Sequence, residues 1–431
     1  MGITSILWTA EVSVYTWLQK GARGIPIAAT MSCVAVLYYG APILEHATFL
    51  DQFDESEVMD AGLTCAGFFL VLVIAAMCGR QIVARKQFRR VEPKAEYIFI
   101  PAVGVGVGVL YQIAVAMNVI GLFGSMFSTV RAIATAICLV SAFLVGGVLG
   151  RKANMGGHEI IGVALIGTYT VLCWTSLLLV QGAIALGTVL AGYCVSARRI
   201  PILTVVAVVA VITVLSAGKS EMRERYWGRM FTPLEAPALM AEWLDEGYSK
   251  IVRGEGATAA MSRTSLLQIV LKVRRLSPDV LPFLYGETYL MAPRNVIPRV
   301  IAADKSDVHE GTIRLAVYYE VQTYEGAQYT SFAMGLVAEA YANFGWAGVV
   351  VVGGILGLLV GMVEGLSEET ETVSFRMLFA INLLALLINP EVDSGTLAAS
   401  VFQSTVGVAM LTVATRWWVR RGRLGITVRM A

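Results

Sequence analysis

Apolar residues occur along the chain in ten long blocks, and most charged residues fall in the gaps between the blocks. All but the block 377–388 approach the roughly 20 residues that an α-helix needs to cross the hydrocarbon layer of a bilayer. The blocks are residues 25–44, 61–79, 97–117, 129–149, 160–176, 178–196, 200–216, 347–363, 377–388 and 397–417. Because a helix satisfies all its backbone hydrogen bonds internally, the pattern predicts an all-α, polytopic transmembrane bundle of about ten spans.

Lysine and arginine in the short connections fall on one side of the membrane under this tracing. They are Lys20, Arg23, the run 80–94, Arg151, Lys152, Arg198, Arg199, Arg376 and the run 416–423. The alternate short connections contain none, and the first of them, residues 45–60, is acidic. Short cytoplasmic loops carry the excess of positive charge, so the pattern predicts that both termini are cytoplasmic. The blocks 160–176 and 178–196 are almost continuous, but the pattern supports two crossings here. A single crossing would put either Arg151 and Lys152 or Arg198 and Arg199 outside.

One long hydrophilic segment, Lys219 to Phe344, interrupts the apolar blocks and falls on the extracytoplasmic side. It contains six of the twelve prolines and two stretches with helical apolar spacing, residues 236–252 and 262–275. Ser262 or Thr264 is suited to cap the second stretch. We expect both helices to lie along the outer membrane surface. The predicted organisation is an N-terminal segment (1–24), a bundle (25–217), a large outer loop (218–346), three further spans (347–417) and a basic cytoplasmic tail (418–431).

The N-terminal stretch, residues 1–18, is apolar but contains Glu11 and has no basic region before its apolar residues. It therefore does not resemble a cleaved signal peptide. We interpret it as a helix lying in the membrane interface, with a further span as the second interpretation. Glycines between Val103 and Leu110 are interpreted as a close-packed helix face within a span rather than as a nucleotide-binding loop.

Composition agrees with a membrane protein and narrows the functional classes. Hydrophobic residues make up 57% of the chain and charged residues 15%, and the mean hydropathy is +0.69. A typical soluble domain has about 25% charged residues. The formal net charge of +2 provides no basic surface for nucleic acid. All six cysteines fall in predicted spans, so neither a disulfide framework nor a thiolate metal site is expected.

The second half of the outer loop contains most of the candidate catalytic and binding residues. They are Arg275, Tyr285-Gly286-Glu287-Thr288-Tyr289, Pro293-Arg294, Ile297-Pro298-Arg299, Asp304-Lys305, His309, Thr330-Ser331 and Glu339-Ala340-Tyr341-Ala342-Asn343-Phe344-Gly345. A guanidinium group matches phosphate oxygens and stays charged at every relevant pH. An arginine-rich site facing the membrane therefore suits a lipid-borne anion, and diphosphate is the obvious candidate.

This set of motifs resembles the polysaccharide polymerases of the Wzy type, the oligosaccharide repeat-unit polymerases. The resemblance covers the second half of the loop and the general layout of many spans with one large outer loop. It implies a metal-independent, GT-C-like glycosyltransferase of the bacterial inner membrane without a cofactor. Its donor and acceptor would be undecaprenyl-diphosphate-linked glycans, its surroundings membrane lipid, and its protein partners a chain-length regulator and a flippase. The first half of the chain contains no motif that bears on this resemblance.

Such a reaction needs cations for the leaving diphosphate and a base for the attacking sugar hydroxyl. Arg299, Arg294 and Lys305 are the cation candidates, with Arg299 first because it stands in the Ile-Pro-Arg motif. Glu339 and Glu287 are the candidate catalytic acids or bases, and His309 is held in reserve.

Further residues of the loop and spans are candidates for binding the substrate. Tyr285, Tyr289, Tyr341 and Asn343 could supply aromatic faces and an amide for sugar rings. Arg275 is a further candidate for the diphosphate, and Arg131, near the outer end of a span, is another. No metal ligands are expected.

Several of these residues have simpler interpretations. Glu339 could be an acid that the dipole of its helix favours in the first turn. Arg131 could extend its side chain to lipid headgroups. Asn343-Phe344-Gly345 could be a turn that admits the chain to a span. Near another span, Glu391 and Asp393 could pair with loop arginines or form an ordinary polar turn.

Three functions remain open at this point. The first is polymerisation of lipid-linked repeat units on the extracytoplasmic face. The second is a glycan ligase that uses the same lipid-linked donor but passes the whole chain to a different acceptor. The third is a transporter or flippase for lipid-linked sugars, which would place its essential polar groups near the middle of the membrane. The predicted spans contain few charges at that depth.

Overall fold

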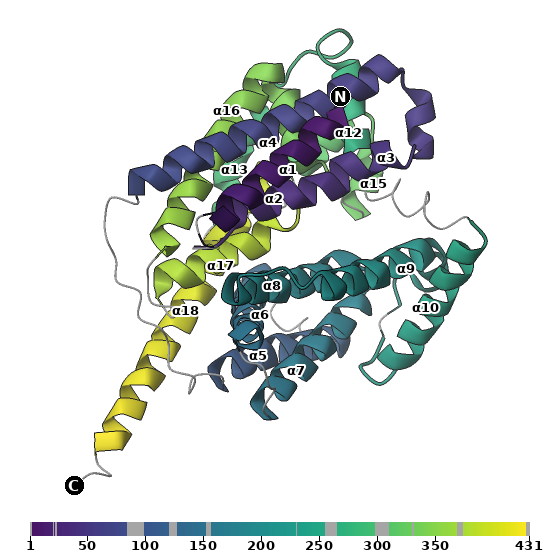
Figure 1. The fold of residues 1–431 in the computed structure, drawn as a ribbon. Helices are drawn as coiled ribbons and strands as arrows, with labels where there is room; N and C mark the ends of the chain where they lie inside the picture. The colour runs from purple at the N-terminus through teal and green to yellow at the C-terminus, as the bar shows by residue number, and fades with distance from the viewer. Residues whose placement is uncertain are drawn as a thin grey trace.

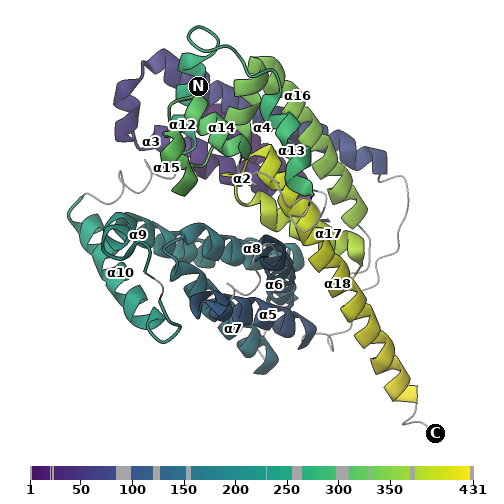
Figure 2. The same cartoon turned by 180° about the vertical axis from the view of Figure 1, so that it is seen from behind.

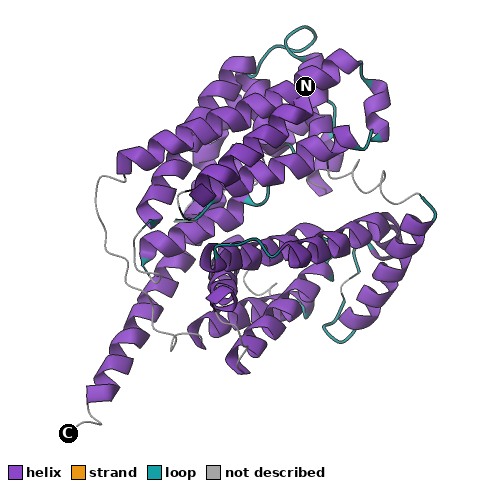
Figure 3. Ribbon diagram, viewed as in Figure 1, coloured by secondary structure: helices purple, strands orange, loops and turns teal. Residues whose placement is uncertain are grey.

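The computed structural model describes residues 2–19, 21, 24–83, 99–119, 127–151, 157–229, 231–254, 265–297, 310–329, 332–368 and 374–427. Within these ranges the protein consists of helices and connecting turns, without a strand (Figure 3). The helices are α1 (Gly2–Gln19), α2 (Ile27–Ala35), η1 (Val36–Gly40), α3 (Ala41–Leu44), η2 (Thr48–Gln52), α4 (Glu55–Val83), α5 (Phe99–Ala116), α6 (Phe127–Arg151), α7 (Gly157–Trp174), α8 (Leu179–Ala197), α9 (Ile202–Tyr226), α10 (Ala236–Val252), α12 (Leu267–Leu276), α13 (Glu287–Val296), α14 (Glu310–Tyr318), α15 (Tyr324–Tyr329), α16 (Gly335–Ser367), α17 (Phe375–Leu387) and α18 (Ser394–Thr427).

Each of the ten predicted apolar blocks falls on a helix or on the continuous run α2–η1–α3. Among the described residues, seven helical segments are long and apolar enough to cross a membrane. They are Ile27–Leu44, Glu55–Val83, Thr129–Arg151, Leu179–Ala197, Ile202–Tyr226, Gly335–Ser367 and Ser394–Trp417. The other three blocks correspond to the shorter apolar helices α5, α7 and α17. These lengths and compositions support the prediction of an all-helical protein embedded in a membrane.

The helices form two groups that meet at α17 and α18. One group contains α1–α4 and α12–α16, so the chain returns to its first helices within the second half of the large loop (Figure 1). The second group contains α5–α10 (Figure 2). Helices α17 and α18 pack against α6, and α17 also contacts α8. This arrangement brings the residues of the loop motifs next to the N-terminal end of α18.

Helices α4 and α16 pack closely because glycines of α16 face the backbone of α4. The glycines recur at every fourth position: Gly353, Gly357, Gly361 and Gly365. The nearest backbone carbonyls to these glycines are those of Phe68, Leu72, Ala76 and Arg80, in the same order. A methyl group added at Gly361 would lie 1.9 Å from the carbonyl oxygen of Ala76. The two helices therefore run parallel at a separation that only small residues permit.

The glycine face predicted between Val103 and Leu110 lies in α5 and packs against α6. A Cβ atom at Gly104 would lie 2.0 Å from Ser141 Oγ, and one at Gly108 would lie 2.4 Å from Cys138 Sγ. The interpretation as a close-packed helix face is thus confirmed for these two glycines.

Helix α10 has the bounds that its apolar spacing predicts, and it folds back along α9. Trp243 is fully buried, and its indole nitrogen donates a hydrogen bond of 2.6 Å to the carbonyl of Leu215. Further along, Lys250 forms an ion pair with Glu221. Helix α10 therefore packs against α9, and its position along the outer membrane surface stays a prediction. The second predicted loop helix is α12, which begins at Leu267, while Ser262 and Thr264 lie outside the described residues.

Helix α1 lies beside α4 along its whole length rather than across the end of the bundle. A Cβ atom at Gly2 would lie 2.8 Å from Gly62 Cα, and Trp17 lines the same small cavity as Ala76 and Met77. The buried face of α1 comprises Gly2, Ile6, Thr9, Ala10, Ser13 and Trp17. Both interpretations of the N-terminal stretch, an interfacial helix and a further span, stay predictions.

Candidate functional site

The two strongest sequence motifs of the loop meet at a kink in α16. Phe344 and Gly345 leave the helical conformation, with φ of −144° and +59°. The kink lets the carbonyls of Ala342 and Asn343 accept hydrogen bonds of 3.0 Å from the backbone N–H groups of Leu284 and Tyr285. The segment Tyr285-Gly286-Glu287-Thr288 is thereby held against Glu339-Ala340-Tyr341-Ala342-Asn343 by backbone hydrogen bonds.

Two glycines make this docking sterically feasible. Gly286 has φ of +93° and Gly345 has φ of +59°, a region that side chains with a Cβ atom rarely adopt. A Cβ atom at Gly345 would also lie 2.8 Å from the ring of Phe283. Phe344 and Gly345 therefore form a kink inside α16 rather than a turn that precedes a span, and Asn343, on the helical side of the kink, belongs to a buried polar network.

That network contains Asn343, Thr288, Glu339 and Ser394. The Asn343 amide nitrogen donates to Thr288 Oγ1 (2.9 Å), and its amide oxygen accepts from the Gly286 N–H (3.0 Å). Thr288 then donates to Glu339 Oε1 (2.8 Å). Ser394 donates to the same carboxylate twice, from its hydroxyl to Oε1 (2.7 Å) and from its N–H to Oε2 (2.7 Å). Because the Asn343 donor fixes the direction of the Thr288 hydroxyl, the network orients the Glu339 side chain.

Glu339 and Asp393 both lie at the N-terminal end of α18. Glu339 is 1% exposed and Asp393 is 2% exposed. Asp393 Oδ1 accepts the N–H of Thr396 (2.6 Å), and its other oxygen accepts the hydroxyl of Thr312. Free backbone N–H groups and the helix dipole favour negative charge at this position. The helix-dipole interpretation of Glu339 thus has a structural basis, although the helix concerned is α18 rather than its own.

Aromatic rings surround the motif junction. Tyr289 stacks on Phe344 with ring centroids 6.3 Å apart and an interplanar angle of 7°. Phe283 packs edge-on against both Tyr341 and Tyr285. The Tyr289 hydroxyl has no hydrogen-bond partner among the described residues. Burial, and then the charge of Glu339, raise the pKa of Tyr289. Tyr285 is 72% exposed, so its ring is the most accessible aromatic surface here.

The predicted cations do not contact Glu339 within the described residues. Arg294 lies in the last turn of α13 and is exposed. Arg275 pairs with Glu57 at 2.6 Å and lies over the ring of Phe53. Arg299 and Lys305, together with His309, fall outside the described residues.

The other predicted catalytic acid has a different environment from Glu339. Glu287 forms an ion pair with Arg314, with nitrogen–oxygen distances of 2.8 and 3.1 Å. Both side chains are close to 40% exposed. Glu287 is therefore reachable by solvent, but its charge is already balanced.

Two polar features outside the motifs can also be placed. Arg131 is exposed on α6 with its guanidinium 5.6 Å from the centroid of the Phe127 ring. Burial raises the pKa of Glu391, and the charges of Lys219 and Arg223 act in the opposite direction. Arg223 donates to the carbonyl of Leu177, and the pairing of Glu391 with a loop arginine stays a prediction.

Thr288, Ser394 and Arg274 were not among the predicted site residues. Thr288 stands in the Gly-Glu-Thr-Tyr motif, but its side chain has neither the charge of Glu287 nor the aromatic ring of Tyr289, which drew the prediction to those residues. Ser394 is separated from Glu339 by 55 residues, so no local pattern connects the two. Arg274 donates to Thr64 (2.6 Å) and Asp60 (3.0 Å), and its guanidinium lies 4.9 Å from the Tyr341 ring centroid.

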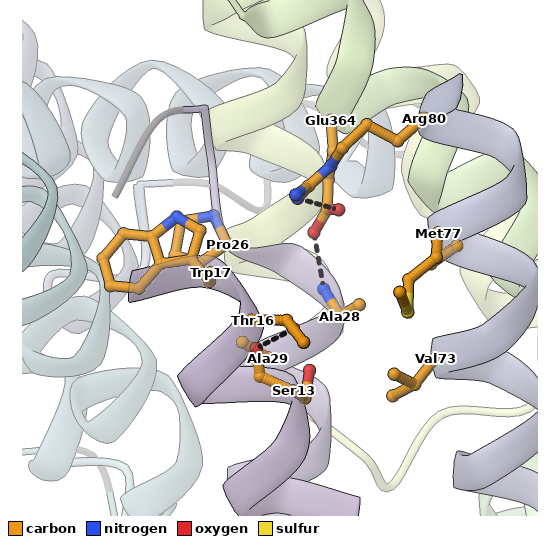
Figure 4. Close-up of a pocket in the computed structure, with 11 residues that line it drawn as sticks. Ser13, Thr16, Trp17, Pro26, Ala28, Ala29, Val73, Met77, Arg80 and Glu364 are labelled. Carbon is orange, nitrogen blue, oxygen red and sulfur yellow. Dashed lines mark hydrogen bonds and ion pairs between the residues drawn. The ribbon is translucent and has the colours of Figure 1, made fainter. Parts of the chain in front are cut away.

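A second buried glutamate marks the other end of α16. Glu364 accepts the N–H of Ala28 at the start of α2 (2.8 Å) and pairs with Arg80 at 2.6 Å (Figure 4). These residues border a cavity of about 20 Å³ to which Trp17 of α1 also contributes (Figure 4). Such a volume is close to that of one water molecule. The cavity therefore does not offer space for a lipid-linked sugar.

Searches against protein-family models, curated proteins and solved structures found no match to this chain. Within the described ranges, no group of three or more His, Cys, Asp or Glu side chains is arranged to hold a metal ion. What the structure provides is an oriented, buried carboxylate beside aromatic rings at one end of a helical membrane bundle.

Proposed function

We propose that the protein transfers a glycan from a polyprenyl-diphosphate carrier to an incoming lipid-linked repeat unit on the extracytoplasmic face, and so polymerises a bacterial surface polysaccharide. One observation carries the proposal. Thr288 of the first motif hydrogen-bonds both Glu339 and Asn343 of the second, although the motifs are about 50 residues apart in the chain. This supports the resemblance to Wzy-type polymerases, because motif residues that serve one reaction must meet in one place.

In the proposed reaction the acceptor hydroxyl attacks the anomeric carbon of the donor glycan. The bond between this carbon and the diphosphate oxygen breaks, and the diphosphate leaves with the electron pair. Arg299, Arg294 and Lys305 are proposed to stabilise the charge that develops on the leaving group. Glu339 is proposed to take the proton of the acceptor hydroxyl. Exposed Tyr285 and half-buried Tyr289 offer aromatic surfaces to sugar rings.

Glu339 must become accessible for this role, because its side chain is 1% exposed. Two of its three hydrogen bonds come from Ser394, at the first turn of α18. A small displacement of this turn would free Oε2 and remove one of the two hydrogen bonds to Oε1, while the Thr288 bond to Oε1 keeps the side chain in place. The proposal therefore includes local opening at Ser394 when substrate binds.

The test uses a strain that lacks the gene and carries either the wild-type protein or a variant. We expect Glu339→Gln and Arg299→Ala to abolish long polymer and to leave single lipid-linked repeat units, with normal amounts of protein in the membrane. Glu325→Gln, which changes an exposed glutamate of α15, is the matched control and should leave polymer length unchanged. Wild-type polymer in both Glu339→Gln and Arg299→Ala cells would refute the assignment.

The same strain separates polymerase from ligase. Loss of polymer with single units remaining is the polymerase result, whereas intact polymer stranded on its lipid carrier would indicate a ligase. A reconstituted protein that moves lipid-linked sugar across vesicles without forming a glycosidic bond would instead indicate a transporter.

A further inference from the structure

Helix α14 lies directly beside the site of Glu339. It packs against α13 (Figure 2). In its first turn, the hydroxyl of Thr312 donates to Asp393, and a Cβ atom at Gly311 would lie 3.9 Å from the Cβ atom of Thr288. Thr288 is the residue whose hydroxyl donates to Glu339. Side chains one turn further along α14 are therefore close to the junction of the two motifs.

Arg314, in that next turn, has a guanidinium group in a fixed position. Its Nε and Nη2 atoms donate to Glu287 at 2.8 and 3.1 Å, and the group lies 4.9 Å from the centroid of the Tyr318 ring. Nη1 makes no hydrogen bond or ion pair with a described residue, and the Glu287 oxygens each retain a lone pair. The side chains of Arg314 and Glu287 are 38% and 41% exposed. The pair thus offers donors and acceptors side by side to a ligand from solvent.

Tyr285 presents an aromatic ring two residues before Glu287. Its φ is +48°, a conformation that costs free energy for a residue with a bulky side chain. The backbone hydrogen bond to Asn343 holds this conformation, and Phe283 packs edge-on against the ring at 6.5 Å. The Tyr285 side chain still remains 72% exposed. Backbone strain retained at an accessible aromatic residue is typical of a binding surface.

The local charges favour an uncharged ligand with many hydroxyl groups over an anion. Glu339, Asp393 and Glu287 bring three carboxyl groups to this end of the bundle, and among the described residues Arg314 is the cation that pairs with one of them. A phosphate group bound here would meet a negative field. A sugar ring fits better, because its hydroxyl groups both donate and accept hydrogen bonds and its apolar face can pack on an aromatic ring.

We propose that Tyr285, Glu287 and Arg314 form the subsite for the acceptor sugar. Tyr285 stacks on the sugar ring, and the Glu287–Arg314 pair binds two neighbouring hydroxyl groups of the same ring. The inference rests on the proposed function, because the sugar whose hydroxyl loses its proton to Glu339 must lie beside that residue. Glu287 is then a binding residue rather than a catalytic acid, and the pair selects which hydroxyl of the acceptor reaches Glu339.

The test is binding of oligosaccharides that carry no lipid carrier. They are obtained by partial acid hydrolysis of the surface polysaccharide of wild-type cells and titrated against the purified full-length protein in detergent by saturation-transfer difference NMR. We expect Arg314→Met to raise the dissociation constant by about tenfold or more, because hydrogen bonds to a charged group are lost. Tyr285→Leu should also weaken binding, whereas Tyr285→Phe keeps the ring face and should bind like the wild type.

Matched controls change an exposed arginine and an exposed tyrosine elsewhere. Arg253→Met and Tyr324→Leu should leave the dissociation constant unchanged. Inorganic diphosphate should not displace the oligosaccharide from the wild-type protein. An oligosaccharide that does not bind, or that binds equally well to Arg314→Met and Tyr285→Leu, would overturn the inference. Displacement by diphosphate that Arg314→Met abolishes would overturn it too, because the pair would then bind anions.

The binding measurement separates this inference from the proposed function. Glu339→Gln should lose polymer in cells and keep oligosaccharide binding, since the residue is not part of the subsite. Normal polymer in Glu339→Gln cells, with binding that still depends on Arg314, would refute the proposed reaction and leave the sugar subsite standing. Loss of polymer in those cells, with binding independent of Arg314, would refute the subsite alone.

Discussion

At the scale of single residues, the site depends on how one carboxylate is oriented. Thr288 donates to Glu339 and accepts from Asn343, so its hydroxyl is the link between the two motifs. Removing the donor to a buried acceptor lowers the stability of the folded protein by more than an average hydrogen bond contributes, because the acceptor then stays buried without a partner.

Thr288→Val keeps the shape of the side chain and removes this link. We expect the free energy of unfolding to fall by about 1–3 kcal/mol and polymer formation to drop. Thr288→Ser restores the hydroxyl and should recover most of both. The measurements are thermal unfolding in detergent and the polymer profile of complemented cells. Equal behaviour of the valine and serine variants would show that the hydroxyl has no orienting role.

The sequence predicted that Glu339, Asn343 and Tyr289 lie close together, because they stand in motifs with a recognisable order, and the structure brings these motifs together. It could not identify Ser394, since that contact depends on how α18 begins beside α16. Nor could it foresee that Glu339 would be enclosed, because burial follows from packing between distant segments. The role of Arg299 stays a prediction.

At the scale of helices, close packing of α4 and α16 depends on where the glycines face. Gly361 faces the backbone of α4, whereas a methyl group at Gly354 would meet only a Val71 side-chain carbon at 3.7 Å. Substitution by alanine should therefore destabilise the protein at Gly361 but not at Gly354.

Gly361→Ala should lower the free energy of unfolding by about 1–3 kcal/mol, because the added methyl group cannot fit beside the Ala76 carbonyl. Gly354→Ala should be neutral or raise it by up to about 1 kcal/mol, because alanine favours the helix more than glycine does. Thermal unfolding of the two variants in detergent makes the comparison. A stable Gly361→Ala protein would contradict the packing described for α4 and α16.

Helix positions were more predictable than helix ends. The apolar block 200–216 covers the first part of α9, but the helix continues to Tyr226, and α10 packs against it. Hydropathy detects contact with the hydrocarbon layer, whereas helix length depends on hydrogen bonds and neighbours. For the same reason, the composition of α1 did not reveal that it lies along α4.

At the scale of the whole molecule, the predicted orientation rests on the distribution of lysine and arginine. Leu234 in the turn between α9 and α10 is 92% exposed and belongs to the large loop. Arg199 follows α8 and is exposed in a short basic connection. The two positions should lie on opposite sides of the membrane.

Leu234→Cys should react with a membrane-impermeant maleimide in intact cells, after removal of the outer barrier if one exists. Arg199→Cys should react only after the inner membrane is opened. The wild-type protein measures the background from the native cysteines. The reverse pattern of labelling would place the large loop in the cytosol and remove the basis of the proposed reaction.

Helix α16 is tethered by an acid near each of its ends, with Glu339 at the first turn of α18 and Glu364 at the first turn of α2. Between these two anchors, the regular backbone ladder is interrupted only at Phe344 and Gly345. Movement of the first part of α16 at Glu339 would therefore change the backbone angles at Phe344 and Gly345 and leave the glycine contacts with α4 in place. The part of α16 before the kink can therefore move during the reaction while the part after the kink stays packed against α4.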